Sequence, residues 1–398
     1  RHMGRIESIS DDAQAKVALT VHSEMTRVRG MLDDGPHLKS LEWLVTDRLA
    51  ESLADQWEMP EITGDTLAFL QYTSGSTGTP KGVMLTHGNL MHNSALITYA
   101  FEMTRSAVGA FWLPMYHDMG LIGGILQPMY SGCPNVLMSP MAFLQKPYRW
   151  LRSITRHRGT VSGGPNFAYD LAARKITPEQ RAKLDLSSWE LAFNGAEPIR
   201  ADTLRFFYET FKDCGLRPET LFACYGMAEA TLLISGGQRR EPPIIRSVDG
   251  EALDNGQVVD AAPDEHGARE LVGCGSKLPD QRTRIVDPDT RKLLSPGRVG
   301  EIWVSGPSVA LGYWNNPDAT SEIFHASPVG SDEGPFLRTG DLGFIQDNEL
   351  FVTGRRKDLI IIRGVNRYPQ DIDQTVETAH SLLRRSAGAA VTVNIGGQ

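Results

Sequence analysis

The segment Tyr72–Gly82 has the composition of a loop that binds phosphate groups. It reads Y-T-S-G-S-T-G-T-P-K-G and follows a run of apolar residues, Leu67–Tyr72, that predicts a strand. Its glycines allow close backbone approach, its hydroxyls donate hydrogen bonds, and Lys81 supplies a positive charge, so the loop suits the triphosphate of ATP. It is not a Walker loop, because Pro80 stands where the second glycine of that motif should be. A flexible linker rich in serine and glycine is the alternative interpretation.

A second segment, Leu113–Gly123, places an imidazole and a carboxylate at the end of a predicted strand. It reads L-P-M-Y-H-D-M-G-L-I-G, and His117 and Asp118 lie on the turn into an apolar helix predicted over Leu121–Leu126. Such a pair can position the anionic head of a substrate while the helix supplies an apolar wall. The alternative is a helix-capping aspartate beside a histidine that already has its hydrogen bond.

Two further polar loops each follow a predicted strand. Asn194–Ile199 reads N-G-A-E-P-I, and Tyr225–Thr231 reads Y-G-M-A-E-A-T. Loops at the carboxyl ends of neighbouring strands form the crevice where nucleotides bind in open α/β sheets. Tyr225 can stack on a planar base, and Glu229 is a hard oxygen ligand suited to Mg²⁺. Taken singly, they also fit an ordinary half-buried aromatic residue and a solvated charge at a helix start.

Two short polar motifs follow in the last third of the chain. Arg338–Gly343 reads R-T-G-D-L-G, and Asp341 on this turn offers two acceptor oxygens that suit a ribose diol. Gly354–Asp358 reads G-R-R-K-D and carries Arg355. Without further support, the alternative interpretations are an ordinary aspartate-containing turn for the first segment and a charged loop before a strand for the second.

Together, and in this order, the motifs resemble those of the adenylate-forming superfamily, which includes acyl-CoA synthetases, luciferases and peptide-synthetase adenylation domains. The resemblance implies that Tyr225 stacks on adenine and that Asp341 and Arg355 contact the ribose. It implies catalytic roles for Lys81, His117 and Glu229, with Glu229 also the Mg²⁺ ligand. The ATP-binding residues that it implies are Thr73, Ser74, Gly75, Ser76, Thr77, Gly78, Thr79, Lys81, Gly195, Ala196, Glu197, Tyr225, Gly226, Met227, Ala228, Asp341 and Arg355.

The resemblance also implies an acid-binding site and a hinge. The residues that it assigns to the acid are His117, Asp118, Met119, Gly120, Ile122 and Asn194. Asp358 matches the hinge between the large and small domains, a pivot that would exchange the adenylating and transfer arrangements. The sequence departs from the family at Ala228, where most members have threonine, so a hydroxyl contact to the adenylate phosphate is lost at that position.

Several motif spellings are similar to those of the fatty acyl-AMP ligases that supply polyketide synthases. They are Tyr116–Gly124, Asn194–Arg200, Tyr225–Thr231 and Arg363–Asp373. This branch implies activation of a fatty acid by ATP to an acyl adenylate, with transfer to an acyl carrier protein. A fatty acyl-CoA ligase is the alternative, since it shares the first half-reaction. The chain is also expected to be truncated at both ends, without the small-domain lysine of the family, which leaves open a nucleotide- and acyl-binding module with little turnover.

The elements that must carry these motifs alternate in type. Buried-looking strands are predicted at Leu67–Tyr72, Ala110–Leu113, Val136–Met138, Thr160–Ser162, Leu191–Phe193 and Leu221–Ala223. Helices are predicted at Leu38–Leu53, Leu90–Phe101, Tyr148–His157, Phe167–Lys175 and Ala201–Phe211. Alternation from about Leu67 to Leu233 predicts a mostly parallel α/β sheet covered by helices. After Gly236, short β-rich runs at Arg284–Val286, Glu301–Val304 and Leu350–Val352 predict a small barrel or distorted sheet.

The expected fold class is therefore α/β, with the adenylate-forming enzyme fold that the resemblance implies. A large domain would span residues 1–354, with parallel-sheet α/β subdomains over 1–236 and a β-rich subdomain over 237–354. Residues 355–398 would hold the hinge and the start of a small α+β domain, with a strand at Leu359–Ile362 and a helix from Gln370 to about Leu383.

Length and charge set the remaining bounds. The chain has 398 residues, and 40 basic against 48 acidic residues give a net charge of −8, which argues against a general nucleic-acid binder. Its 4 cysteines are far apart and form no metal-binding pattern, which indicates a reducing compartment. No apolar run reaches the ~18 residues that a spanning helix needs. We therefore expect a cytoplasmic protein without integral membrane association.

Overall fold

The computed structural model describes residues 3–30, 32, 35–73, 80–362, 365–380, 382–383 and 388–391. Contacts divide the chain into two compact units. One contains Arg1–Asn89 and Ala310–Phe324, and the other contains Leu90–Val309 and His325–Gln398. No helix of the described residues is long and apolar enough to cross a membrane.

The first unit contains two small sheets. β1 (Val17–Thr20) pairs in parallel with β2 (Glu42–Val45), and β3 (Leu67–Thr73) pairs antiparallel with β4 (Lys81–Thr86). The other elements are α1 (Met3–Asp12), α2 (His22–Arg29), α3 (Pro36–Ser40), α12 (Pro317–Phe324) and the 3-10 turns Thr46–Arg48 and Glu51–Gln56.

Two predictions for this unit are wrong. The helix expected over residues 38–53 is instead α3, β2 and two 3-10 turns, because the β-forming run in β2 pairs with β1. β3 exists as predicted, but it lies outside the large parallel sheet and pairs with β4. Only residues 74–80 separate the two strands, too few for a crossover helix, which agrees with the antiparallel pairing of β3 and β4.

The second unit is built on a seven-stranded sheet with the order β13-β10-β9-β8-β7-β5-β6. The strands from β6 to β9 run parallel, and β10 and β13 pair antiparallel at one edge. Their bounds are β5 Gly109–Phe111, β6 Asn135–Leu137, β7 Val161–Gly164, β8 Leu191–Asn194, β9 Leu221–Gly226, β10 Leu233–Gly236 and β13 Ser276–Lys277. The predicted α/β class is confirmed, and each predicted strand of this sheet overlaps an observed one.

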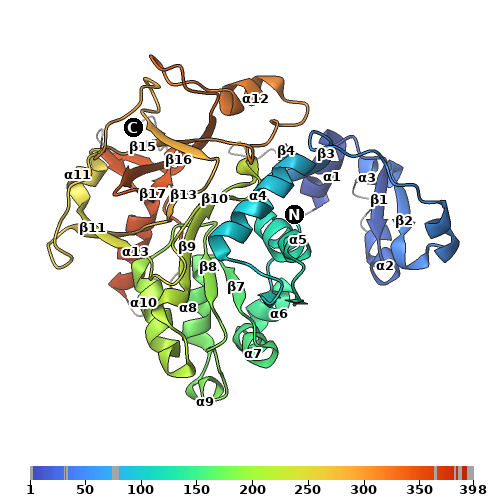
Figure 1. The fold of residues 1–398 in the computed structure, drawn as a ribbon, viewed down its shortest axis with the longest axis horizontal. Coiled ribbons are helices and arrows are strands. Elements are labelled where there is room, and N and C mark those ends of the chain that lie inside the picture. The colour runs from blue at the N-terminus through green and yellow to red at the C-terminus, as the bar shows by residue number, and fades with distance from the viewer. Residues whose placement is uncertain are drawn as a thin grey trace. The chain divides into compact units, whose positions relative to one another are not determined.

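Helices cover this sheet, and several lie alongside its strands in Figure 1. They are α4 (His87–Phe101), α5 (Gln127–Ser131), α6 (Pro140–Gln145), α7 (Tyr148–His157), α8 (Asn166–Lys175), α9 (Pro178–Arg181) and α10 (Ala201–Phe211). α7, α8 and α10 bury large aromatic side chains that pack edge to face, with 5.5 Å between the ring centres of Trp150 and Tyr169 and 4.9 Å between those of Tyr169 and Phe207. Each such burial contributes about 1.5–3 kcal/mol, so this layer holds the strand ends in place.

The β-rich part of the same unit is an antiparallel meander rather than a closed barrel. β14 (Arg282–Val286), β15 (Gly300–Ser305), β16 (Leu337–Gln346) and β17 (Glu349–Arg355) pair in chain order. Phe344 and Phe351 stack across the last pair with ring centres 4.9 Å apart. The remaining elements are β11 (Ile245–Asp249), α11 (Gly250–Asp254), β12 (Ala268–Val272), β18 (Ile360–Ile362), β19 (Val365–Arg367) and α13 (Pro369–Ala379).

Candidate functional site

Three residues predicted to bind nucleotide lie together in the second unit. The carboxylate of Asp341 on β16 is buried, and its Oδ2 accepts a hydrogen bond of 2.7 Å from the hydroxyl of Tyr225 at the end of β9. Its Oδ1 lies 3.3 Å from Nε of Arg355, the last residue of β17. Asp341 and Arg355 face each other in register across the β16–β17 hairpin, whereas Tyr225 lies 116 residues before Asp341 and is brought to the pair by the tertiary fold.

Opposing effects act on the charge of this cluster. Burial raises the pKa of Asp341, while Arg355 and the Tyr225 hydroxyl lower it by stabilising the carboxylate. Burial, and then the neighbouring Asp341 charge, raise the pKa of Tyr225 well above its ordinary value. Tyr225 therefore remains a hydrogen-bond donor at any pH of interest. Burial is the largest effect on Asp341 and raises its pKa overall, while the ionised carboxylate is the form that accepts hydrogen bonds from Tyr225 and from a ribose diol.

Asp341 lies inside β16 rather than on a free turn, at a place where the register with β15 shifts. We call this bulged segment, residues 338–341, the Asp341 turn, and a buried ion pair supports it. Arg338 donates from Nε and Nη2 to the carboxylate of Glu301, at 3.1 and 2.8 Å to Oε2, and both side chains are buried. The same carboxylate accepts from the backbone N–H of Gly340 at 3.2 Å. Gly340 has a φ of +72°, a left-handed conformation that glycine adopts readily. Neither Glu301 nor Arg338 was predicted to have a role, although the arginine three residues before Asp341 could have indicated one.

The loop after β8 contains strain and an unsatisfied amide. Asn194, the last residue of β8, is buried, and neither its side-chain oxygen nor its nitrogen has a hydrogen-bond partner among the described residues. Ala196 has a φ of +68°, which is uncommon for a residue other than glycine and is typical of functional loops. Glu197 accepts a 2.5 Å hydrogen bond from the backbone N–H of Phe167 in α8. A Cβ on Gly195 would lie 2.9 Å from a backbone oxygen of β9, so the two strand-exit loops are close.

The predicted acid-binding segment begins with a close His117–Asp118 pair. Nδ1 of His117 lies 2.5 Å from Oδ1 of Asp118, and that hydrogen bond raises the pKa of His117. Asp118 also accepts from the backbone N–H of Met119 at 2.6 Å, so it caps the following helix. Both interpretations offered from the sequence are therefore compatible with the geometry, because the aspartate caps the helix and holds the histidine.

The helix itself differs from the expected one. Met119–Leu126 forms a π-helix, a conformation that is rare and often found at functional sites. Met119, Gly120 and Ile122 are buried. A Cβ on Gly120 would stand 2.0 Å from the carbonyl oxygen of Pro114, so only glycine allows the helix to start this close to the preceding turn.

Glu229 lies in a short 3-10 turn, Ala228–Ala230, and is buried. The turn is preceded by Met227 and Gly226, where a Cβ would stand 1.7 Å from a backbone oxygen. Among the described residues, no group of three or more His, Cys, Asp or Glu side chains could hold a metal ion. A single carboxylate suits Mg²⁺ only where substrate phosphates and water supply the other oxygens, which is how this ion usually binds nucleotides.

The phosphate-loop motif lies partly outside the described residues, since Ser74, Gly75, Ser76, Thr77, Gly78 and Thr79 are not among them. Its flanking residues are in the first unit, where Thr73 of β3 faces Lys81 of β4 in register. The Lys81 ammonium lies 4.8 Å from the centre of the Tyr313 ring. The Tyr72 hydroxyl donates to Asp12 at 2.5 Å and anchors the end of β3.

The predicted hinge residue Asp358 closes a 3-10 turn, Arg356–Asp358, after β17. The segment that follows is tied to the rest of the second unit around the buried carboxylate of Asp254. Arg269 donates to Asp254 at 2.6 Å, and Arg367 of β19 forms a further ion pair with it. Asp371 of α13 also pairs with Arg269, at 3.1 Å.

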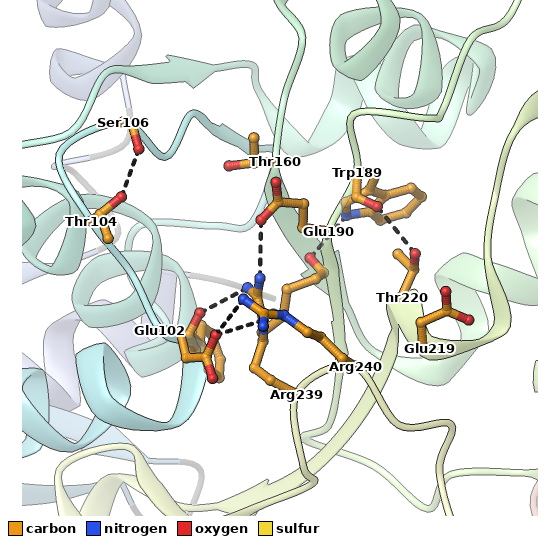
Figure 2. A network of polar contacts seen from close by, with 12 residues as sticks. Glu102, Thr104, Ser106, Thr160, Trp189, Glu190, Glu219, Thr220, Arg239 and Arg240 are labelled. Carbon is orange, nitrogen blue, oxygen red and sulfur yellow. Dashed lines mark hydrogen bonds and ion pairs between the residues drawn. The ribbon is translucent and has the colours of Figure 1, made fainter.

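A separate polar network lies at the other end of the parallel strands, where the strands begin (Figure 2). Arg239 follows β10 and pairs with Glu190 at 3.0 Å and with Glu102 at 3.8 Å, and Arg240 also pairs with Glu102, at 3.1 Å. Glu190 directly precedes β8, so the network lies at the amino ends of the parallel strands and not at their carboxyl ends. Nucleotide sites in such sheets lie at the carboxyl ends. We therefore interpret this network as structural.

Comparison with known proteins gives the class of the molecule. Residues 3–314 match the family of AMP-binding enzymes. The fatty acid AMP ligase from Legionella pneumophila has a similar structure, with a TM-score of 0.85 and 41% sequence identity over 99% of this chain and 68% of that chain. The fatty acyl-adenylate ligase from the same organism, in complex with acyl adenylate and pyrophosphate, gives a TM-score of 0.84 at 41% identity, covering 95% of this chain and 65% of that chain. The chain therefore belongs to the AMP-binding enzyme family.

Curated relatives are named for one branch of that family. A medium-chain-fatty-acid–[acyl-carrier-protein] ligase, JamA of Moorena producens (strain JHB), is 48% identical over 100% of this chain and 68% of its own length. TtuA of Teredinibacter turnerae (strain ATCC 39867 / T7901), with the same description, is 45% identical over 85% of this chain and 53% of its own length. The resemblance to fatty acyl-AMP ligases is thus confirmed. The chain spans between about half and two-thirds of the length of these relatives.

Proposed function

We propose that the protein activates a fatty acid with ATP: R–COO⁻ + ATP → R–CO–AMP + PPi. The observation that carries this proposal is the buried pair of Tyr225 and Asp341 with the exposed Arg355 beside it, which offers a carboxylate for a ribose at the carboxyl end of β9. The similarity to fatty acyl-AMP ligases at 41–48% identity supports the same reaction.

Each predicted residue has a role in this reaction that its chemistry supports. His117, with its pKa raised by Asp118, would carry a positive charge that attracts the fatty carboxylate. Lys81 would offset negative charge on the phosphates, and Glu229 would hold Mg²⁺, which neutralises charge on the departing pyrophosphate. The carboxylate attacks the α-phosphorus, and the α–β bridging oxygen leaves with pyrophosphate. Positioning and charge compensation are therefore the main catalytic tasks of the chain.

We further propose an acyl carrier protein as the acceptor of the acyl group. Two relatives at 45–48% identity are named as ligases of medium-chain fatty acids to carrier proteins, which favours this acceptor over coenzyme A. A carrier protein of a polyketide synthase is the form of acceptor that the motif spellings favour. The acid would then be transferred as a thioester on the carrier, with release of AMP.

Pyrophosphate exchange tests the first half-reaction. The chain is incubated with ATP, Mg²⁺, a series of fatty acids and labelled pyrophosphate, and acyl adenylates are identified by mass spectrometry. We expect acid-dependent exchange, and we expect Asp341→Ala to weaken ATP binding in titration calorimetry. Asp347→Ala is the matched control, because it removes an exposed aspartate at the end of the same strand pair. Normal ATP affinity in Asp341→Ala would remove this residue from the site.

The acceptor is tested in the same system. Thioester formation on added carrier protein, with little acyl-CoA, supports the proposal. Efficient acyl-CoA formation would instead favour a fatty acyl-CoA ligase. ATP binding without exchange for any acid would assign the chain a binding role and contradict the proposed reaction.

A further inference from the structure

The hydroxyl of Tyr225 makes a contact that a base-stacking role does not require. Stacking on adenine uses the face of the ring, whereas the hydroxyl points away from that face, in the plane of the ring, and donates to Asp341 at 2.7 Å. Both side chains are buried, with exposed fractions of 8% for Tyr225 and 7% for Asp341. A hydrogen bond from a neutral donor to a buried carboxylate is among the stronger ones in proteins.

A count of acceptor positions shows what this hydrogen bond leaves available. An ionised carboxylate has four lone-pair positions, two on each oxygen. Tyr225 uses one position on Oδ2, and Arg355 faces one on Oδ1. One position then remains on each oxygen. Two neighbouring hydroxyl groups, as on C2′ and C3′ of a ribose, can donate to these two positions at once.

Hydrogen bonds within the Asp341 turn fix the backbone of Asp341, whereas other residues orient its side chain. The Asp341 N–H donates to Oγ1 of Thr339 at 3.1 Å, and that hydroxyl donates to the carbonyl of Ile302 at 2.7 Å. Among the described residues, the side chains that orient the Asp341 carboxylate are those of Tyr225 and Arg355. Arg355 is more than half exposed, so Tyr225 is the better ordered of the two.

We propose that Tyr225 is a positioning residue whose hydroxyl orients the Asp341 carboxylate, so that Asp341 recognises the ribose diol of ATP. This inference rests on the proposed function, because it takes ATP as the ligand. It gives the tyrosine a second role, in which the ring faces the base and the hydroxyl acts on the sugar through Asp341. Discrimination between ribose and a sugar without hydroxyls then depends on a residue that does not itself contact the sugar.

The charges around Asp341 define how this role depends on pH. Arg355 of β17 and Lys357 of the following turn favour the carboxylate, whereas burial and the charge of Asp358 oppose it. The Tyr225 hydrogen bond lowers the pKa of Asp341. Ribose recognition is therefore complete above that pKa and is lost as the pH falls through it. Removing the hydroxyl moves this loss to higher pH.

The experiment compares ATP with 2′,3′-dideoxy-ATP in titration calorimetry on the full chain, for the wild type and Tyr225→Phe. Phenylalanine keeps the ring and removes only the hydroxyl. We expect the affinity for ATP to fall about tenfold, which is the effect of one charge-assisted hydrogen bond, while the affinity for the dideoxy nucleotide is unchanged. The ratio of the two affinities should fall by the same factor, and the pH at which it is lost should rise.

Tyr169→Phe is the matched control. Tyr169 is fully buried under the same sheet, and its hydroxyl donates to the backbone carbonyl of Phe193 at 2.6 Å rather than to Asp341. This variant should lose some stability and keep the wild-type ratio of affinities. An unchanged ratio in Tyr225→Phe, or a variant that does not fold, would overturn the positioning role.

The failure of the proposed function gives a different result. A wild type that binds ATP and the dideoxy nucleotide equally would show that Asp341 does not read the ribose, whatever Tyr225 does. The pH series on the wild type adds a measurement that needs no variant. A ratio that does not decline at acid pH would contradict an Asp341 carboxylate as the ribose acceptor.

Discussion

The buried pair of Glu301 and Arg338 allows a quantitative test of how the Asp341 turn is held. Glu301→Gln keeps the shape of the side chain but leaves the Arg338 charge buried without a counter-ion. Breaking a buried ion pair in this way costs about 3–5 kcal/mol. The glutamine oxygen can still accept from Gly340 or from the guanidinium, so we expect the lower end, about 3 kcal/mol.

A double variant separates the ion pair from packing. Glu301→Leu with Arg338→Met replaces both charges by apolar groups, which is often close to neutral. The Gly340 N–H then loses its acceptor, at a cost of about 1 kcal/mol. The double variant should therefore recover about 2 of the 3 kcal/mol lost in the single variant. Glu270→Gln is the control, since its pair with Arg205 is similar but exposed and should be worth at most about 1 kcal/mol.

Urea unfolding monitored by circular dichroism measures these free energies, and tryptophan fluorescence adds a local probe. The Arg338 guanidinium lies 5.5 Å from the centre of the buried Trp303 ring, so its rearrangement should change the emission. Titration with ATP then reports whether the turn still presents Asp341. A Glu301→Gln variant as stable as the wild type, or a double variant no better than the single one, would refute this account of the turn.

Three further predictions concern other parts of the site. Asp118→Asn should lower the pKa of His117, because the hydrogen bond that the His117 imidazole donates to the Asp118 carboxylate is the main cause that raises it. The stability from this pair, which is present at low pH and is lost as the pH rises through the raised pKa, should disappear in the variant. Histidine NMR titration and unfolding at several pH values would measure both effects. Gly120→Ala should destabilise the chain by about 3 kcal/mol in urea, since its Cβ would clash with a backbone oxygen, whereas Gly123→Ala meets only a side chain at 3.3 Å and should cost much less. Arg355→Gln should change stability little, because this side chain is 57% exposed, but ATP affinity should fall and its loss at acid pH should begin at higher pH; equal pH profiles would contradict a role for this arginine at the nucleotide.

The elements of the parallel sheet were predictable because local signals agree with tertiary structure there. α7 and α10 were predicted with the bounds that the structure gives, since each buries an apolar stripe at helical spacing. The helix predicted over residues 38–53 was wrong, since periodicity alone does not distinguish a helix from a short strand paired with a distant partner. Nothing in the local sequence showed that Met119–Leu126 would be a π-helix, because that geometry follows from close packing against the preceding turn.

In the candidate site, the residues expected to contact the nucleotide were predictable from the sequence, whereas the residues that hold them in place were not. Asp341, Tyr225 and Arg355 were predicted because each has a residue type and motif that the chemistry of a nucleotide requires. Their mutual hydrogen bonds were not predictable, since 116 residues separate Tyr225 from Asp341 and neither motif refers to the other. A supporting group such as Glu301 needs only to be an acceptor at the right place, and many residues in the chain satisfy that condition. The role of such a residue depends on its position in the fold and not on its residue type, so it can be identified only from the three-dimensional structure.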